Sequence, residues 1–130
     1  MSREPRAVVE EFFERMGDDR RETIDELFAD DAVITLPGAR FEGPTAPDDF
    51  LAFLAPRYER AAKEFDRWLV SNSTVVSIGT LYGVDNGGEP FEGVRYVDVY
   101  EVSDGRIRRL DIWNDHAVDG VVSTDSDEDR

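Results

Sequence analysis

The stretch YVDVYEVSDGRI (Tyr96–Ile107) decides the fold, because two runs of alternating residues meet there at a tight turn. Ser103-Asp104-Gly105 carries the residue types that antiparallel hairpins use in their turns. The alternation continues on both sides and predicts strands at Phe91–Val102 and Arg106–Val118. Because successive side chains point to opposite faces of a strand, each face of this hairpin can be assigned from the sequence.

Upstream of the hairpin, the pattern predicts two more strands, at Phe65–Ser71 and Thr74–Gly83. Amphipathic periodicity and capping residues predict helices before them. These helices are expected at Glu4–Met16, at Arg20–Phe28 and from Asp48 to about Ala55, with a short strand at Ala32–Leu36.

Two segments between these elements carry weaker signals. Phe41–Pro47 contains glycine and two prolines and is expected to be a loop, and Arg57–Lys63 is expected to add a helical turn. Helices followed by an antiparallel meander define an α+β fold, with three N-terminal helices packed on a strongly curved, mostly antiparallel sheet. A helical layer covers one sheet face, so the other face must be solvated or pair with a second subunit.

The 130 residues fit one domain, which we place at residues 1–118, followed by an acidic tail at residues 119–130 that we expect to be disordered. The chain has no cysteine, so disulfides and thiolate zinc sites are excluded. It has no run of eighteen apolar residues and no signal-peptide pattern at its start. We therefore expect a cytoplasmic protein with no membrane partner.

The charge balance is unusual, with 30 acidic and 15 basic residues and a formal net charge of −15. Lys63 is the only lysine. Abundant acids with scarce lysine resemble the composition of haloarchaeal cytosolic proteins, in which high salt screens the self-repulsion. A mesophilic protein with an acidic binding face is the alternative. Nucleic acid is not expected as a partner, because a phosphate backbone requires a basic surface.

Several strings, taken in order, resemble the NTF2-like superfamily and its SnoaL-like and ketosteroid-isomerase-like members. The first helix ends in Gly17-Asp18-Asp19, and LFADDAV (Leu27–Val33) leads into the first strand. The closing hairpin ends on Trp113-Asn114-Asp115. The resemblance extends from Val8 to about Ala117 and implies a cone of sheet and helices around one apolar pocket. It does not fix the function, since this fold carries many activities.

Asp98 is the first candidate site residue. It shares a strand face with Val94, Tyr96, Tyr100 and Val102. An acid among such apolar and aromatic side chains is not typical of a strand face that is exposed to solvent. If that face lines the pocket, burial raises the pKa of Asp98. The resemblance places Asp98 at the oxyanion-hole aspartate of ketosteroid isomerase, which donates a hydrogen bond as a neutral acid. The alternative is a register in which Asp98 faces outward and pairs with an arginine.

The other catalytic positions of that isomerase fall, by the same resemblance, at Phe12 and Leu36, which cannot transfer protons. Steroid isomerisation by that route is therefore not expected. SnoaL-type cyclases carry an acid on the last strand, at the position of Ile112 here. A shift of register would bring Asp111 or Asp115 inward instead.

The inward face of the last strand is expected to carry Leu110, Ile112, Asn114 and His116. His116 is the only histidine and a possible proton carrier beside Asp98; a surface histidine is the alternative. We expect no cofactor and no metal. A metal site would require the side chains of Asp98, Asp115 and His116 to lie close together. The expected ligand-binding residues are Phe12, Leu36, Tyr96, Tyr100, Leu110, Ile112 and Asn114, with Asp98 and His116 as catalytic candidates.

Two functional hypotheses follow. In the first, the pocket binds a small apolar molecule with a carbonyl group, and Asp98 anchors it or transfers a proton in an isomerase, cyclase or dehydratase reaction. In the second, the chain is a non-catalytic binding or accessory module. Both expect a homodimer through the outer sheet face, where Trp113 is an aromatic residue of the kind enriched at interfaces.

Overall fold

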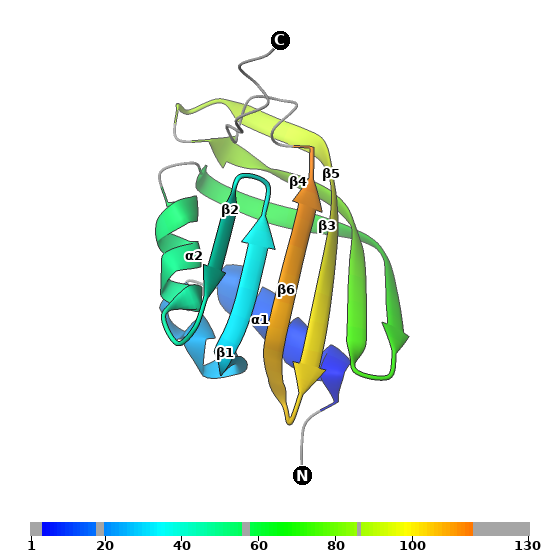
Figure 1. Ribbon diagram of the computed structural model, residues 1–130. Helices are drawn as coiled ribbons and strands as arrows, with labels where there is room; N and C mark the ends of the chain where they lie inside the picture. Colours follow the sequence, from blue (N-terminus) through cyan, green and yellow to red (C-terminus); the bar gives the residue numbers. More distant parts are fainter. Residues whose placement is uncertain (1–3, 18–19, 56–57, 86, 116–130) are drawn as a thin grey trace.

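The computed structural model describes residues 4–17, 20–55, 58–85 and 87–115, and the side chains of residues 58–61 are left out of the description. It shows an α+β fold in which a six-stranded curved sheet packs against helices on one face (Figure 1). The elements in order are α1 (Pro5–Gly17), the 3-10 helix η1 (Arg21–Leu27), β1 (Phe28–Leu36), β2 (Ala39–Glu42), α2 (Ala46–Leu54), β3 (Tyr58–Ser71), β4 (Thr74–Asp85), β5 (Pro90–Ser103) and β6 (Arg106–Asn114).

The strand order in the sheet is β2-β1-β6-β5-β4-β3. All neighbours are antiparallel except β1 and β6, which pair in parallel. The long strands β3, β4 and β5 bend around the helices, so that the sheet wraps over α1 (Figure 1). This curvature leaves room between the helices and the concave face of the sheet.

A bulge between Phe65 and Arg67 contributes to the bend of β3. Gly79 of β4 lies opposite, and a Cβ atom there would lie 2.1 Å from the carbonyl oxygen of Glu64. The two backbones therefore approach closely enough at this point to require glycine.

The first helices and strands differ in part from the expected ones. The second helix is a 3-10 helix that ends at Leu27, and β1 begins at Phe28, four residues before the expected start. Phe28 pairs with Ile107 of β6, and the exposed Asp31 forms an ion pair with Arg108. Phe28 and Val33 pair with β6 on either side of Asp30-Asp31, so this weakly β-prone segment is included in the strand as an irregular stretch.

Two segments were predicted incorrectly. Phe41–Pro47 is not a single loop, because β2 pairs with β1 through Glu42 and α2 begins at Ala46. Arg57–Lys63 is not a helical turn, since β3 runs from Tyr58 and pairs with β4 through Lys63 and Leu81. In the first case a hairpin with the preceding strand, and in the second case pairing with residues about 20 positions away, outweighs local propensity. The expected extension of the last strand to Val118 and the tail at residues 119–130 lie outside the described residues.

The core lies between the helices and the concave face of the sheet. Its largest group of buried side chains includes Val8, Val9 and Phe12 from α1, Ile24 and Leu27 from η1, Phe50 from α2, and Ile34, Val75, Tyr100, Val102, Ile107 and Leu110 from the sheet. Burial of apolar area on this scale is the main stabilising term of such a domain.

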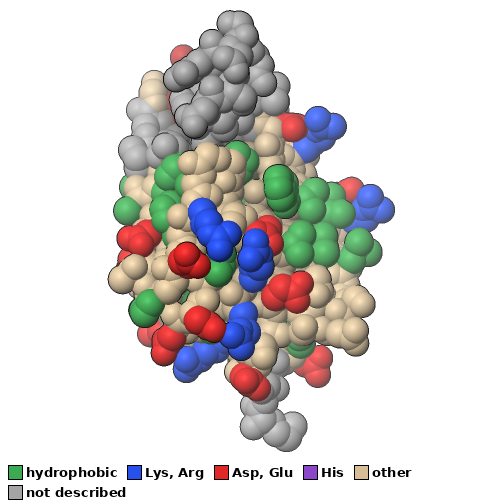
Figure 2. Space-filling view, in the orientation of Figure 1, with side chains coloured by type: hydrophobic (Ala, Val, Ile, Leu, Met, Phe, Trp, Pro, Cys, Tyr) green, Lys and Arg blue, Asp and Glu red, His purple; other side chains and the backbone are tan. Residues whose placement is uncertain are grey.

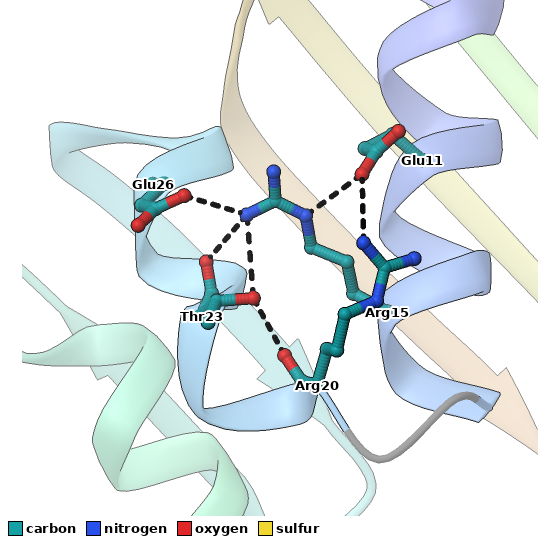
Figure 3. Close-up of polar contacts among 5 residues, drawn as sticks. All are labelled: Glu11, Arg15, Arg20, Thr23 and Glu26. Atoms are coloured by element: carbon teal, nitrogen blue, oxygen red, sulfur yellow. Dashed lines mark hydrogen bonds and ion pairs between the residues drawn. The ribbon is translucent and has the colours of Figure 1, made fainter.

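Arg15 holds α1 and η1 together at one end of this core (Figure 3). Its guanidinium donates to Glu11 at 2.8 Å, to the carbonyl oxygen of Thr23 at 2.8 Å and to Glu26 at 2.9 Å. Its side chain is only 17% exposed, and Arg20 lies 3.9 Å from the same Glu11 carboxylate. Because Met16, Gly17 and Arg21 line the cavity described next, this network fixes one rim of the cavity.

Candidate functional site: an apolar pocket with a buried carboxyl group

A cavity of about 380 Å³ lies between the helices and the sheet. Its walls are mainly aromatic and aliphatic and come from every layer of the fold: Phe12, Phe13, Leu36, Phe50, Leu54, Phe65, Leu81 and Ile112. Polar groups enter mainly from the sheet, namely Lys63, Tyr96, Asp98, Tyr100 and Asn114, and Glu14 and Arg21 enter from the helices. A small number of polar groups in an apolar cavity of this size is typical of small-molecule sites.

Asp98 is the most deeply placed charged group of this cavity, with an exposed fraction of 2%. It lies on the inward face of β5 together with Val94, Tyr96, Tyr100 and Val102, all of which are buried. The alternation of apolar and polar residues in this strand therefore assigned its inward face correctly.

The carboxyl group of Asp98 is incompletely hydrogen-bonded. The hydroxyl of Tyr100 donates to Oδ2 at 3.4 Å, and Nζ of Lys63 lies 3.5 Å from the same oxygen. Within the described part of the chain, Oδ1 has no hydrogen-bond partner. Burial raises the pKa of Asp98, while Lys63 and Tyr100 act in the opposite direction with smaller effect. The side chain is therefore biased toward the neutral acid, which has a hydrogen to donate.

The two neighbouring tyrosines remain neutral. Tyr96 shares a hydrogen bond of 2.8 Å with Ser77, in which either hydroxyl can donate, and burial raises the pKa of Tyr96 to about 12. Burial, followed by the charge of Asp98, raises the pKa of Tyr100 well above its ordinary value. Both phenols can therefore donate or accept hydrogen bonds without ionising in the pocket.

Lys63 is a member of the site that the sequence did not identify. Its side chain is 25% exposed and reaches the cavity from β3. Nζ lies 5.2 Å from the ring centre of Phe13 and 4.9 Å from that of Tyr96, which places the ammonium over two aromatic faces. The sequence shows that Lys63 is the only lysine. Because its segment was expected to form a helical turn, the sequence did not indicate that Lys63 lies beside Asp98.

Most of the other predicted site residues line the same cavity. Phe12, Leu36 and Ile112 contribute apolar wall, and Asn114 contributes a polar group. Leu110 does not line the cavity: it pairs with Ile34 and Tyr100 and is completely buried in the core beneath it. His116 lies outside the described residues, so the suggested pairing with Asp98 is not tested.

Asp111 of β6 and Asp115, which directly follows β6, do not line the cavity. Asp111 accepts hydrogen bonds from Thr35 and Arg109; these lower its pKa against the opposing effect of desolvation. Asp115 pairs with Arg95 at 2.6 Å. Trp113 is 63% exposed. The register in which these acids would point inward does not occur.

Trp68 belongs to the wall of the core and does not fill the cavity. Its ring packs at 5.5 Å from the ring of Phe13, with an edge-on geometry. Among residues 4–17, 20–55, 58–85 and 87–115, no group of three acidic or histidine side chains could hold a metal ion. No helix in the same ranges is both long and apolar enough to cross a bilayer.

The comparisons with known proteins agree with this architecture. The model of the SnoaL-like domain family matches residues 9–110, and the chain belongs to that family. No curated protein matches the sequence.

Among solved structures, a candidate SnoaL-like polyketide cyclase from Jannaschia sp. CCS1 superposes with a TM-score of 0.78, with 20% identity and 92% of each chain covered. TerC co-crystallised with polyporic acid gives 0.79, with 16% identity over 91% of this chain and 96% of the other. An LEH-like epoxide hydrolase from M. tuberculosis gives 0.69, with 23% identity over 86% and 83%. These superpositions, together with that on an NTF2-like protein from Burkholderia pseudomallei, show the NTF2-like fold and leave the activity open.

Proposed function

We propose that the chain binds a small, largely apolar molecule with a carbonyl group in this cavity, with Asp98 as the hydrogen-bond donor to the carbonyl oxygen. The observation that carries this proposal is the buried carboxyl group whose Oδ1 atom has no partner among the described residues. A buried polar atom without a partner costs about 1–3 kcal/mol, so a ligand that supplies one gains binding energy.

The shape and lining of the cavity support an apolar ligand. Aromatic and aliphatic side chains from the helices and from a sheet that we take to form a cone enclose it, and no charged group besides Asp98, Lys63, Glu14 and Arg21 lines it among the described residues. The co-crystallisation of the structurally similar TerC with polyporic acid supports an organic ligand for this chain as well.

If the chain is an enzyme, the reaction class is proton transfer beside the carbonyl, as in isomerisation, cyclisation or dehydration. A donor at the carbonyl oxygen stabilises the enolate that forms when a neighbouring C–H loses its proton. A base must then remove that proton, and Asn114 and Leu36 of the cavity lining cannot do so. Glu14, which lines the cavity, and His116 are the candidates in the sequence for this role.

A thermal-shift screen in molar KCl tests the binding function. Steroid-like, polyketide-like and small enone compounds would be offered to the wild type, to Asp98→Leu and to Asp30→Leu, a control that changes an exposed aspartate on β1. We expect at least one compound to raise the melting temperature of the wild type and of the control but not of Asp98→Leu. A compound series that shifts none of the proteins would contradict the proposal.

As a second candidate function, the chain acts as a homodimeric accessory module. The exposed hydrophobic side chains on the outer face of the sheet favour this function. Trp113 is 63% exposed there and pairs across the strands with Val97, and hydrophobic side chains gather on the sheet among charged ones (Figure 2). Large exposed apolar groups of this kind mark interaction surfaces. Light scattering of the wild type and of Trp113→Glu would separate a dimer from a monomer.

We also propose that the strongly acidic composition reflects a haloarchaeal type of adaptation to a salt-rich cytoplasm. The net charge of −15 and the single lysine support this proposal.

A further inference from the structure

The ammonium of Lys63 is an unassigned feature of the cavity. It is the one lysine of the chain, it enters from β3, and it lies beside the buried Asp98. A charged group on an edge strand is normally solvated, yet this side chain is three-quarters buried among the rings of Phe13 and Tyr96.

The ion pair with Asp98 does not satisfy either partner. The 3.5 Å separation between Nζ and Oδ2 exceeds the 2.7–2.9 Å that is usual for charge-assisted hydrogen bonds. An ammonium has three hydrogens to donate. The contacts that the described residues supply are this long ion pair and two aromatic faces, and Oδ1 of Asp98 has no partner there. Hydrogen-bonding capacity therefore remains on both groups, and both residues line the cavity.

We propose that Lys63 and Asp98 together bind a negatively charged oxygen, so that the pocket prefers apolar molecules with an acidic carbonyl-derived head, such as aromatic carboxylates or the enolates of 1,3-dicarbonyl compounds. This inference rests on the proposed function and specifies the ligand class of the same site. Lys63 supplies the positive charge, and Asp98 in its acid form donates a hydrogen bond from the carboxyl group.

Besides Lys63 and Asp98, the described lining of the cavity holds two groups of opposite charge and two phenols. Glu14 from α1 and Arg21 from η1 also line the cavity, and Tyr96 and Tyr100 from β5 stay neutral. The anionic oxygen of the ligand would repel a negatively charged Asp98, so binding of the ligand favours the acid form of Asp98. The net charge of −15 repels anions at long range, so a local cation is the feature that such a ligand needs.

A matched pair of probes tests the proposal: 2-naphthoate, which is an anion, and 2-acetylnaphthalene, which is a neutral ketone of similar shape. Their affinities would be measured by calorimetry in molar KCl, where long-range repulsion is screened. The proteins would be the wild type, Lys63→Met, Lys63→Arg and Arg67→Met. Arg67 is an exposed residue on the same strand, so its variant removes one positive charge outside the cavity.

We expect the wild type to bind naphthoate more tightly than the ketone. Lys63→Met should weaken naphthoate binding by about tenfold or more and leave the ketone within about twofold, whereas Lys63→Arg and Arg67→Met should keep the preference for naphthoate. Retained ketone binding shows that Lys63→Met is folded. Equal naphthoate binding by wild type and Lys63→Met, or equal loss of both probes, would overturn the inference. If the ketone binds and depends on Asp98 but naphthoate has no advantage, the proposed function stands and this inference fails; if neither probe binds, both fail.

Discussion

Replacement of Asp98 by asparagine should change how stability depends on pH. Burial raises the pKa of Asp98 in the folded protein. In the unfolded chain the pKa of an aspartate is about 3.9. Between these two values the folded state holds more protons than the unfolded state, so the free energy of unfolding falls as the pH rises. The stabilisation by the neutral acid is complete below the unfolded pKa and is lost as the pH passes through the folded pKa.

The magnitude follows from the same linkage. Each pKa unit between the folded and unfolded states corresponds to about 1.36 kcal/mol of stability. Asparagine has nearly the same shape and does not titrate. The difference in unfolding free energy, wild type minus Asp98→Asn, should therefore decrease by about that amount per pH unit from about pH 4 until the pH passes the folded pKa, and then stay constant. Each kcal/mol corresponds to about 3–5 °C in melting temperature for a domain of this size.

Urea unfolding between pH 4 and pH 9 at constant molar KCl would measure this difference. The other carboxylates titrate alike in both proteins, so their contribution cancels. Asp30→Asn, an exposed change, provides the control and should run parallel to the wild type. Parallel curves for Asp98→Asn and the wild type would refute the reasoning, because they would show that the pKa of Asp98 is the same in the folded and unfolded states.

Three further predictions concern the scaffold. Arg15→Met removes the hydrogen bonds that join α1 to η1 and should destabilise the protein by about 1–3 kcal/mol in urea unfolding; an effect no larger than that of the exposed Arg6→Met would contradict the role of this network. Gly79→Ala places a Cβ atom against the backbone of Glu64 and should cost about 2–3 kcal/mol, measured in the same way; unchanged stability would mean that the strands do not approach so closely at the bulge. The melting temperature should rise between low and molar KCl, because salt screens a net charge of −15; a constant value would argue against adaptation to salt.

The sequence predicted well the parts of the fold that follow from local patterns. The alternation around Asp98 identified the buried face of β5, and the turn at Ser103–Gly105 located the hairpin with β6. Strict alternation is informative because the two faces of a strand differ in burial throughout its length. The alternation therefore placed Asp98, Tyr96 and Tyr100 on the cavity side of β5, but most of the cavity lining, including Lys63 and the helix residues Phe13 and Phe50, was not among the predicted site residues.

The parts that were missed depend on pairing between distant segments. The start of β3 reads as a helical turn, and only its pairing with β4 shows that Lys63 lies opposite Leu81 on the inward face. The depth of the cavity likewise depends on how far the sheet curves, which separates Leu110 in the core from Ile112 in the cavity wall. Neither feature has a local signal in the sequence.

Infrared difference spectroscopy of bound 2-acetylnaphthalene, labelled with ¹³C at its carbonyl, tests the central claim most directly. A hydrogen bond from Asp98 would lower the carbonyl stretching frequency relative to a hydrocarbon solvent. We predict this lowering in the wild type and in Asp30→Leu, and its loss in Asp98→Leu, where the side chain has no hydrogen to donate. An unshifted band in the wild type, or the same lowered band in Asp98→Leu, would show that Asp98 does not contact the carbonyl oxygen.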